Sequence, residues 1–281
     1  MTGRNIALTG VPRGGTTLSC HLLDACADTV ALFEPMDVTA LDETPAGALD
    51  QVDAFFSQSR HSLLTAGTAP SKHRGGTVPD NPFGERDPDG RRRLQVDHGQ
   101  IAPGRPAEGF TLVVKHNAAF CALLPDLATR FDTLAIVRNP LAVLASWNTV
   151  DLPVSQGRIP AGERLDQALR QRLDAEPDRL ARQLIVLAWF FEQFQLQLAP
   201  SRVLRYEDIV ATGGDALRRA AGLQGAPRRD LALRNSSALY RDTQISPLVD
   251  ALHRYDDAPW STWYDHAAIS VLAADLGVAT A

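Results

Sequence analysis

Apolar and polar residues alternate along most of the chain in a way that predicts short strands separated by helices. Five apolar runs have the length and composition of buried parallel strands, namely 5–9, 30–33, 110–114, 132–137 and 202–206. Apolar residues at helical spacing follow the first run and occur again at 178–198, and Pro140 stands where another helix would begin. This alternation predicts an α/β fold of three layers, with a central parallel sheet flanked by helices and a ligand site at the carboxyl edge of the strands.

The pattern weakens between about residues 44 and 109. Within this stretch, residues 72–109 are rich in Gly, Pro, Asp and Arg. A loop of that length inside a compact domain is usually functional or disordered. We therefore predict one domain over residues 1–281, with a loop-rich and mobile insertion beside its substrate.

Composition excludes several classes of function. Hydrophobic residues make up 44% of the 281 residues, which is enough for a core, and the net charge of -5 gives no bulk attraction to nucleic acid. No stretch approaches the roughly 20 apolar residues of a membrane span, and no signal peptide precedes the first strand. Cys20, Cys26 and Cys121 lie in apolar surroundings without metal-ligand spacing, which favours free thiols. These features predict a cytoplasmic protein without a bound metal, and they leave the oligomeric state open.

The first candidate binding element lies between the first strand and the first helix, from Gly10 to Thr17. Such a loop directs backbone N–H groups and the positive end of a helix toward one point, as a phosphate requires. The spacing of Gly10 and Gly15 matches the nucleotide-binding P-loop, but Thr16 stands at the lysine position and the basic residue is Arg13. A kinase would lose its phosphate-binding lysine by this change, whereas a ligand with one phosphate in the loop would not need it.

A second candidate element follows the run at 132–137. Arg138 lies just past the strand end, and Ser146 lies eight residues later, two turns into the next helix. A guanidinium at a strand edge and a hydroxyl from the following helix can converge on a separate phosphate. An arginine after a strand is by itself weak support for a phosphate site, because most such residues form ion pairs. The support is stronger here because the first candidate element occurs in the same chain.

Together the two elements resemble the sulfotransferases that use 3'-phosphoadenosine-5'-phosphosulfate (PAPS). The phosphosulfate loop of that family reads Pro-Lys/Arg-Ser-Gly-Thr-Thr, and residues 12–17 match it with one departure, Gly14 in place of Ser. The 3'-phosphate motif of the family, an Arg at a strand end and a Ser eight residues later, is matched by Arg138 and Ser146. A third similar segment is Leu204-Arg-Tyr-Glu-Asp208, so the resemblance runs from the first strand to the fifth. It implies a P-loop-like fold.

The resemblance also implies which residues hold PAPS and its product, 3'-phosphoadenosine 5'-phosphate (3',5'-ADP). The 5'-phosphosulfate would be held by Arg13, Thr16, Thr17 and the amides of Gly14 and Gly15. The 3'-phosphate, which distinguishes this cofactor from ATP, would be held by Arg138 and Ser146. Tyr206 stands either near the adenine or in a structural role at the strand end. A Ser-rich stretch of tyrosylprotein-type members resembles residues 235–241 and adds Ser236 and Arg241.

Sulfuryl transfer needs a base for the acceptor proton and cations for the charge on the departing phosphate. Glu34 follows the second strand, where a Glu acts as base in tyrosylprotein and several bacterial members. His116 follows the third strand, as the catalytic His of cytosolic members does, but one residue early, which can turn its side chain away. Lys115 matches the catalytic lysine of tyrosylprotein-like members. We predict Glu34 as the base, Lys115 and Arg13 as stabilising cations, and His116 as the alternative base.

The predicted reaction transfers a sulfuryl group from PAPS to a hydroxyl or amine of a small-molecule acceptor. A P-loop small-molecule kinase is the alternative enzyme, although the loop lysine and a clear acidic magnesium site are missing from the sequence. A third alternative is a nucleotide-binding protein without catalysis, which would not require Glu34 and Lys115. The run Arg91–Arg93 in the insertion indicates a solvated face or a contact with an anionic acceptor.

Overall fold

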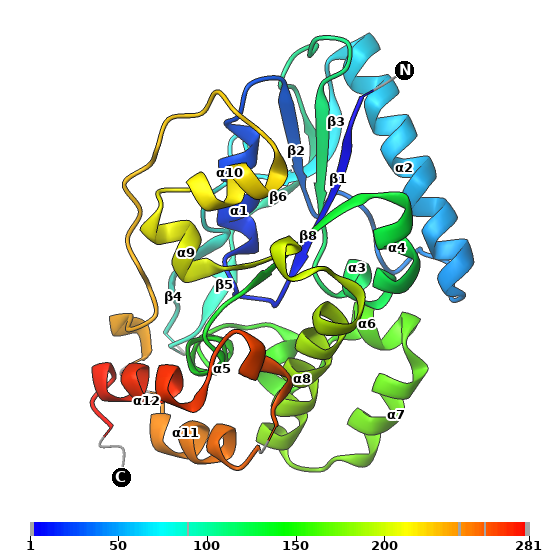
Figure 1. Ribbon diagram of the computed structural model, residues 1–281. Helices are drawn as coiled ribbons and strands as arrows, with labels where there is room; N and C mark the ends of the chain where they lie inside the picture. Colours follow the sequence, from blue (N-terminus) through cyan, green and yellow to red (C-terminus); the bar gives the residue numbers. More distant parts are fainter. Residues whose placement is uncertain (1–2, 89, 241–242, 256, 279–281) are drawn as a thin grey trace.

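The structure, a computed structural model, describes residues 3–88, 90–240, 243–255 and 257–278. Its centre is a sheet of five parallel strands in the order β2-β7-β1-β8-β9 (Figure 1). These strands are β1 (Asn5–Gly10), β2 (Thr29–Phe33), β7 (Thr111–Lys115), β8 (Asp132–Val137) and β9 (Val203–Arg205). They coincide with the five apolar runs, so the predicted α/β, P-loop-like fold with a central parallel sheet is confirmed.

Alternating side chains of each strand face two layers of helices. In β1, Ile6 and Leu8 share a buried cluster with α1 (Thr16–Asp24), whereas Ala7 belongs to a second cluster with α2 (Pro45–Ala66). Figure 1 shows α1 and α10 (Asp215–Ala221) on one side of the sheet, and α2 and α4 (Leu124–Arg130) on the other. The sheet is therefore the buried middle layer. Because helices cover both of its faces, a ligand can contact it only where the strands end.

A third buried cluster includes Val137, Val203, Trp147, Phe190 and Trp260, and most of the remaining helices contribute to it. Asn139 and Asp178 cap two of these helices, since their side chains accept hydrogen bonds from the amides of Leu141 and Ala181. The remaining α-helices are α3 (Ala118–Ala122), α5 (Pro140–Trp147), α6 (Pro160–Leu165), α7 (Gln167–Ala175), α8 (Arg179–Gln197), α9 (Tyr206–Ala211), α11 (Ile245–His253) and α12 (His266–Asp275). Short 3-10 helices lie at Pro153–Gln156, Pro200–Arg202, Ala238–Tyr240 and Pro259–Thr262.

The expectation of a loop-rich segment at 44–109 is wrong for its first third, where α2 forms a helix of 22 residues. Thr44 caps this helix through its side chain, and the buried residues Leu49, Val52 and Phe56 recur at helical spacing. The remainder holds two small antiparallel sheets, made of β3 (Ala69–His73) with β6 (Asp97–Ile101) and of β4 (Phe83–Arg86) with β5 (Arg92–Leu94). The helical period was obscured because Gly and Pro dominate the second half of the segment.

The stretch from Asn117 to Arg130 does not form one continuous helix. It divides into α3 and α4 at Leu123, where Pro125 begins the next turn, and the side chain of Asn117 makes no capping hydrogen bond. In the described part of the chain, no helix is both long and apolar enough to span a membrane.

Candidate active site

The carboxyl edge of the sheet opens into a cavity of about 1530 Å³. Residues that follow four different strands line it, namely Arg13 after β1, Glu34 after β2, His116 after β7 and Arg138 after β8. Small-molecule pockets usually measure about 300–1,000 Å³, so this cavity has room for two ligands at once. The register explains the convergence, because Phe33 pairs with Lys115 and Gly10 with Ile136, which aligns the strand ends.

The loop between β1 and α1 is a tight turn, held by a backbone hydrogen bond and packed against Tyr206. The amide of Gly14 donates to the carbonyl of Val11 over 2.8 Å, and Gly14 does not line the cavity. Gly15 has a φ of 93°, and a Cβ there would lie 2.5 Å from the ring of Tyr206, so both backbone conformation and space require glycine. Thr16 and Thr17 begin α1 and line the cavity, as the resemblance implies.

Arg13 projects from this loop into a largely buried position. Its Nε donates to Ser146 Oγ over 3.1 Å, and its guanidinium lies 4.1 Å from the ring centre of Phe83. Burial, reinforced by the nearby charges of Arg138 and Arg92, lowers the pKa of Arg13 to about 10. Arg13 therefore remains charged at neutral pH, in a place where a bound anion would offset its desolvation.

Arg138 is buried beside the same loop, but protein groups already occupy most of its donors. Its guanidinium donates to the carbonyls of Arg13 and Arg234 over 3.0 and 2.7 Å. It also donates to Asn235 Oδ1 over 2.8 Å and to the hydroxyl of Tyr240 over 3.2 Å. Arg138 thus ties the β1–α1 loop to residues 234–240 and contributes positive charge to the site.

The segment Leu204–Asp208 has a structural role that the sequence did not reveal. Glu207 accepts hydrogen bonds from the amide of Asn139, from Asn235 Nδ2 and from the hydroxyl of Tyr264. Asn235 in turn accepts from Arg138, so Glu207 orients the arginine through one intermediate residue. The link from Asn235 to Arg138 follows only from tertiary contacts, because 97 positions separate the two residues.

Other predicted cofactor residues lie in different relations to the cavity. Ser146 is buried behind Arg13 and does not line the cavity, and Tyr206 lines it with its ring 4.8 Å from the Arg138 guanidinium. Ser236 is exposed and does not line the cavity, whereas its neighbour Ser237 does. Arg241 lies outside the described residues.

Glu34 lies at the cavity wall between the two lysines of the chain. Its Oε1 accepts from Lys115 Nζ over 2.5 Å, and its Oε2 accepts from Lys72 Nζ over 2.6 Å. The side chain of Lys115 is 2% exposed, while those of Glu34 and Lys72 are 24% and 27% exposed. Lys115 is therefore buried in the protein, whereas Lys72 is exposed enough to leave Glu34 and bind solvent or a ligand instead.

The charge state of Glu34 follows from these neighbours. Burial favours the protonated acid, but Lys115, Lys72 and His116 together outweigh burial and hold the pKa of Glu34 well below its usual range. The carboxylate is ionised at neutral pH. It can accept a proton from an acceptor hydroxyl only if one of its two oxygens is freed from a lysine.

His116 is arranged differently from a free base. Its Nε2 accepts a hydrogen bond from the amide of Met36 over 3.2 Å, and its ring packs edge-on against Phe120. Burial lowers the pKa of His116 to about 3, against the opposing effect of Glu34. The neutral ring thus carries its proton on Nδ1 and already uses its lone pair within the protein.

Sequence reasoning missed Lys72, which it placed in the mobile insertion. Strand β3 carries Lys72 to the end of β2, where Ser71 Oγ accepts from the amide of Phe33 over 3.0 Å. A signal existed, because the chain has 28 basic residues and only Lys72 and Lys115 are lysines. Both of them meet at one carboxylate.

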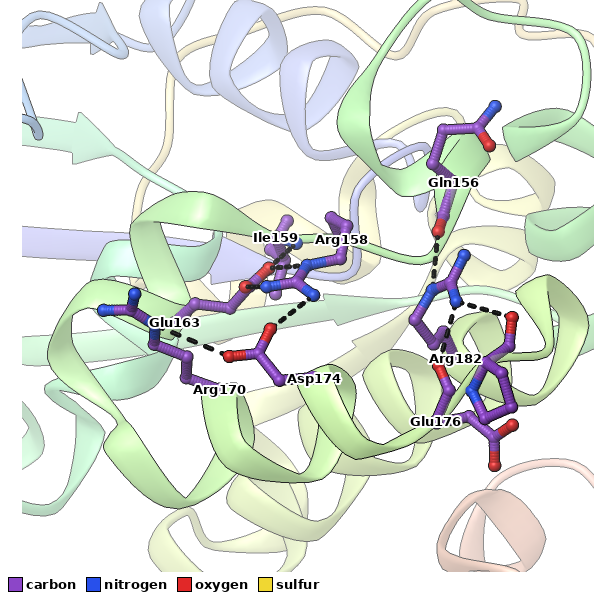
Figure 2. A network of polar contacts seen from close by, with 9 residues as sticks. Gln156, Arg158, Ile159, Glu163, Arg170, Asp174, Glu176 and Arg182 are labelled. Carbon is purple, nitrogen blue, oxygen red and sulfur yellow. Dashed lines mark hydrogen bonds and ion pairs between the residues drawn. The ribbon is translucent and has the colours of Figure 1, made fainter.

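Helices α6 and α7 form another wall of the cavity, and a polar network holds them (Figure 2). Glu163 is buried and accepts from Arg158 Nε over 3.2 Å and from the amide of Ile159 over 2.6 Å. Arg158 also donates to Asp174 over 2.7 Å. Figure 2 shows this guanidinium between the two carboxylates, so its charge is neutralised inside the wall.

Metal ligands are not gathered at this site. Within residues 3–88, 90–240, 243–255 and 257–278, no group of three or more His, Cys, Asp or Glu side chains is placed to hold a metal ion.

Comparisons with known proteins return little. No family model matches the chain, and no curated protein sequence matches it. Among solved structures, the chain is similar to the crystal structure of the sulfotransferase STF1 from Mycobacterium tuberculosis H37Rv, with 15% identity. That match covers 99% of this chain and 78% of the other chain, with a TM-score of 0.37. A likeness at this level supports no conclusion about function, which must come from the geometry of the site.

Proposed function

We propose that this chain is a sulfotransferase that moves a sulfuryl group from PAPS to a hydroxyl or amine of a small-molecule acceptor. The observation that carries the proposal is one cavity that holds both a cationic phosphate-type loop and, at the neighbouring strand ends, a carboxylate between two lysines. Binding alone would not require Glu34 and Lys115 beside the loop. A kinase would use a loop lysine, but Thr16 occupies that position.

The residues present fit a nucleotide that carries a phosphosulfate and a second phosphate. Within the described ranges, both Nη groups of Arg13 have no hydrogen-bond partner, and Arg13 lines the cavity. Thr16, Thr17 and the amide end of α1 face the same space. When bound, PAPS supplies the activated sulfuryl group.

Glu34 and the residues near it would supply the base and the cations that sulfuryl transfer needs. Glu34 takes the proton of the acceptor at Oε2 once the more exposed Lys72 has released that oxygen. Lys115 and Arg13 stabilise negative charge that develops on the departing phosphate. His116 orients the chain between β2 and the insertion through the amide of Met36. The roles of Ser236 and Arg241, a cytoplasmic location and a single domain stay predictions.

Binding calorimetry on the intact protein tests the proposal. We expect 3',5'-ADP to bind at least about tenfold more tightly than ADP or ATP, because a phosphate at the 3' position gains charge-assisted hydrogen bonds that a longer 5' chain does not. Tighter binding of ATP in the presence of Mg²⁺ would support the kinase instead. Equal affinity for all three nucleotides would overturn the assignment.

A further inference from the structure

The three consecutive arginines of the insertion do not share one environment. Arg91 and Arg93 are exposed and pair with carboxylates, at 3.9 Å from Asp151 and 2.9 Å from Asp87. Arg92 is half-buried and lines the cavity. Side chains alternate across a strand, so β5 turns the middle arginine inward while its neighbours stay outside.

Backbone hydrogen bonds fix the position of Arg92 beside the candidate phosphate elements. Its amide donates to the carbonyl of Thr149 over 3.0 Å, and its carbonyl accepts from the amide of Asp151 over 3.0 Å. Thr149 follows α5, the helix that carries Ser146. The β4–β5 hairpin is therefore joined to the end of the helix whose hydroxyl contacts Arg13.

The side chain of Arg92 completes a cluster of guanidinium groups. Arg13 and Arg92 lie 4.1 and 5.8 Å from the ring centre of the same residue, Phe83, and Arg138 is close enough to Arg13 to oppose its charge. Within the described ranges, none of the three forms an ion pair with a carboxylate. Clustered positive charge without a counter-ion is unfavourable unless an anion joins it.

Free donors in this cluster belong to Arg92 and Arg13 rather than to Arg138. Arg92 donates from Nε to the carbonyl of Gly84 over 2.7 Å and from Nη2 to that of Phe83 over 3.2 Å. Its Nη1 has no partner in the part of the chain that the structure describes. The two carbonyl bonds restrain the guanidinium of a side chain that lines the cavity.

We propose that Arg92, supplied by the insertion, is a direct ligand of the 3'-phosphate of the nucleotide, with Phe83 as the platform that orients it against Arg13. This inference rests on the proposed function. The 3' position is assigned because the β4–β5 hairpin contacts the segment that holds Arg138. Arg86 donates to the carbonyl of Leu239, and the neighbouring Tyr240 accepts from Arg138. Arg138 contributes charge and holds the loop, while Arg92 supplies an N–H group that protein atoms do not already use.

Calorimetry with variants of the intact chain tests the proposal. Arg92→Ala should weaken 3',5'-ADP by about tenfold to a hundredfold and leave 5'-AMP within about twofold, because only the former carries the 3'-phosphate. Arg91→Ala is the matched control, since it removes the same charge from the same hairpin on the outer face, and it should change neither affinity. Arg92→Gln removes the charge but keeps a polar side chain with an N–H donor at the place of Nε, which bonds the carbonyl of Gly84. It therefore separates loss of the ligand from loss of the hairpin.

The outcomes distinguish this inference from the proposed function. If the natural protein prefers 3',5'-ADP to ADP and ATP but Arg92→Ala and Arg92→Gln retain full affinity, the inference is wrong and the function stands. Equal losses for 3',5'-ADP and 5'-AMP would move Arg92 to the 5' side and overturn the assignment. If Arg91→Ala and Arg92→Ala lose the same affinity for 3',5'-ADP, the effect comes from the net charge of the hairpin. That result would also overturn the assignment of Arg92 as a direct ligand. If the natural protein shows no preference for 3',5'-ADP, the proposed function itself fails.

Discussion

Glu34 has an unusual backbone conformation for a residue other than glycine, with a φ of 41°. Left-handed conformations of this kind are costly and persist where the surroundings over-determine them. Here the amide of Glu34 donates to the carbonyl of Lys115 over 2.9 Å, and the carboxylate is held by both lysines. The strained backbone thus aims one side chain at the cavity edge, which is consistent with a functional rather than a packing role.

Replacing Glu34 by Gln should reduce kcat by about 10²–10⁴-fold, because the amide keeps the shape of the carboxylate but cannot take a proton. The affinity for 3',5'-ADP should change little. Turnover is measured at saturating PAPS with the best acceptor from a panel of phenols and aliphatic alcohols. His116→Ala is the comparison variant, and it should retain most of kcat because its lone pair is already used by Met36. A dead His116 variant beside an active Glu34 variant would reverse the assignment of the base.

Lys72 should control the pH dependence of the reaction. Charged and titratable groups around Glu34 are Lys115 and His116 on β7 and its end, Lys72 on β3, and Cys20 on α1. The three basic groups lower the pKa of the carboxylate, so removing one of them raises it. Because Glu34 acts only when ionised, activity is lost as pH falls through its pKa. Lys72→Met should therefore shift the acidic limb of the kcat/KM profile to higher pH, by about one pH unit or more.

Two variants test whether this shift comes from the charge at position 72. Lys72→Arg keeps a cation and should restore the limb toward that of the natural protein. Arg74→Met removes a charge from the residue after β3, where the guanidinium donates to the carbonyl of Gln95 rather than to Glu34, and it should not move the limb. An unchanged profile in Lys72→Met would exclude an electrostatic link to Glu34.

At the scale of the elements, two walls of the cavity differ in how firmly they are held. One wall is formed by α6 and α7, and the other by the β4–β5 hairpin. The α6–α7 wall is held by Glu163, which is buried and fully bonded. The β4–β5 hairpin has two short strands, and isolated two-stranded hairpins are marginally stable in water. Its backbone attachment to α5 runs through the two hydrogen bonds of Arg92. Ligand-dependent order is therefore expected on the hairpin side.

Hydrogen exchange should detect this difference. The amides of residues 72–109, and above all those of the β4–β5 hairpin, should exchange rapidly without ligand and become protected when 3',5'-ADP binds. The reason is that the bound phosphate would contact Arg92, which packs beside Phe83, and would hold the hairpin in place. Amides of α6 and α7 provide the internal reference and should be protected in both states. Strong protection of the hairpin in the ligand-free protein would contradict a mobile lid.

At the scale of the whole molecule, net charge and local charge have opposite signs. The chain carries a formal charge of -5, yet the lysines and arginines that line the cavity outnumber its carboxylates by ten to five. Among the ten are Arg13, Lys72, Arg92, Lys115 and Arg138. A concave site walled by protein raises the local potential for anions even when the surface is negative overall. The fold produces this contrast by aligning the carboxyl ends of β1, β2, β7 and β8 and by adding two strands of the insertion.

The sequence by itself determined the sheet and the β1–α1 loop. Apolar runs of strand length and the glycines of residues 10–15 act through local conformation, which neighbouring residues specify without help from the rest of the chain. Arg138 and Glu34 could be nominated for the same reason, because each directly follows a strand whose end must lie at the ligand edge. The helix α2 was missed, since its period is weak beside the Gly and Pro of the following segment.

Only the tertiary structure decided which side chains share the cavity. Lys72 and Arg92 enter it because β3 and β5 pack against the ends of β2 and α5, and no local pattern encodes those contacts. The lone pair of His116 is used by an amide 80 positions away in the sequence, and the donors of Arg138 are used by residues 234–240. Hydrogen bonds and ion pairs act over a few ångströms in space, so groups far apart in the chain meet only after the sheet has aligned its strand ends.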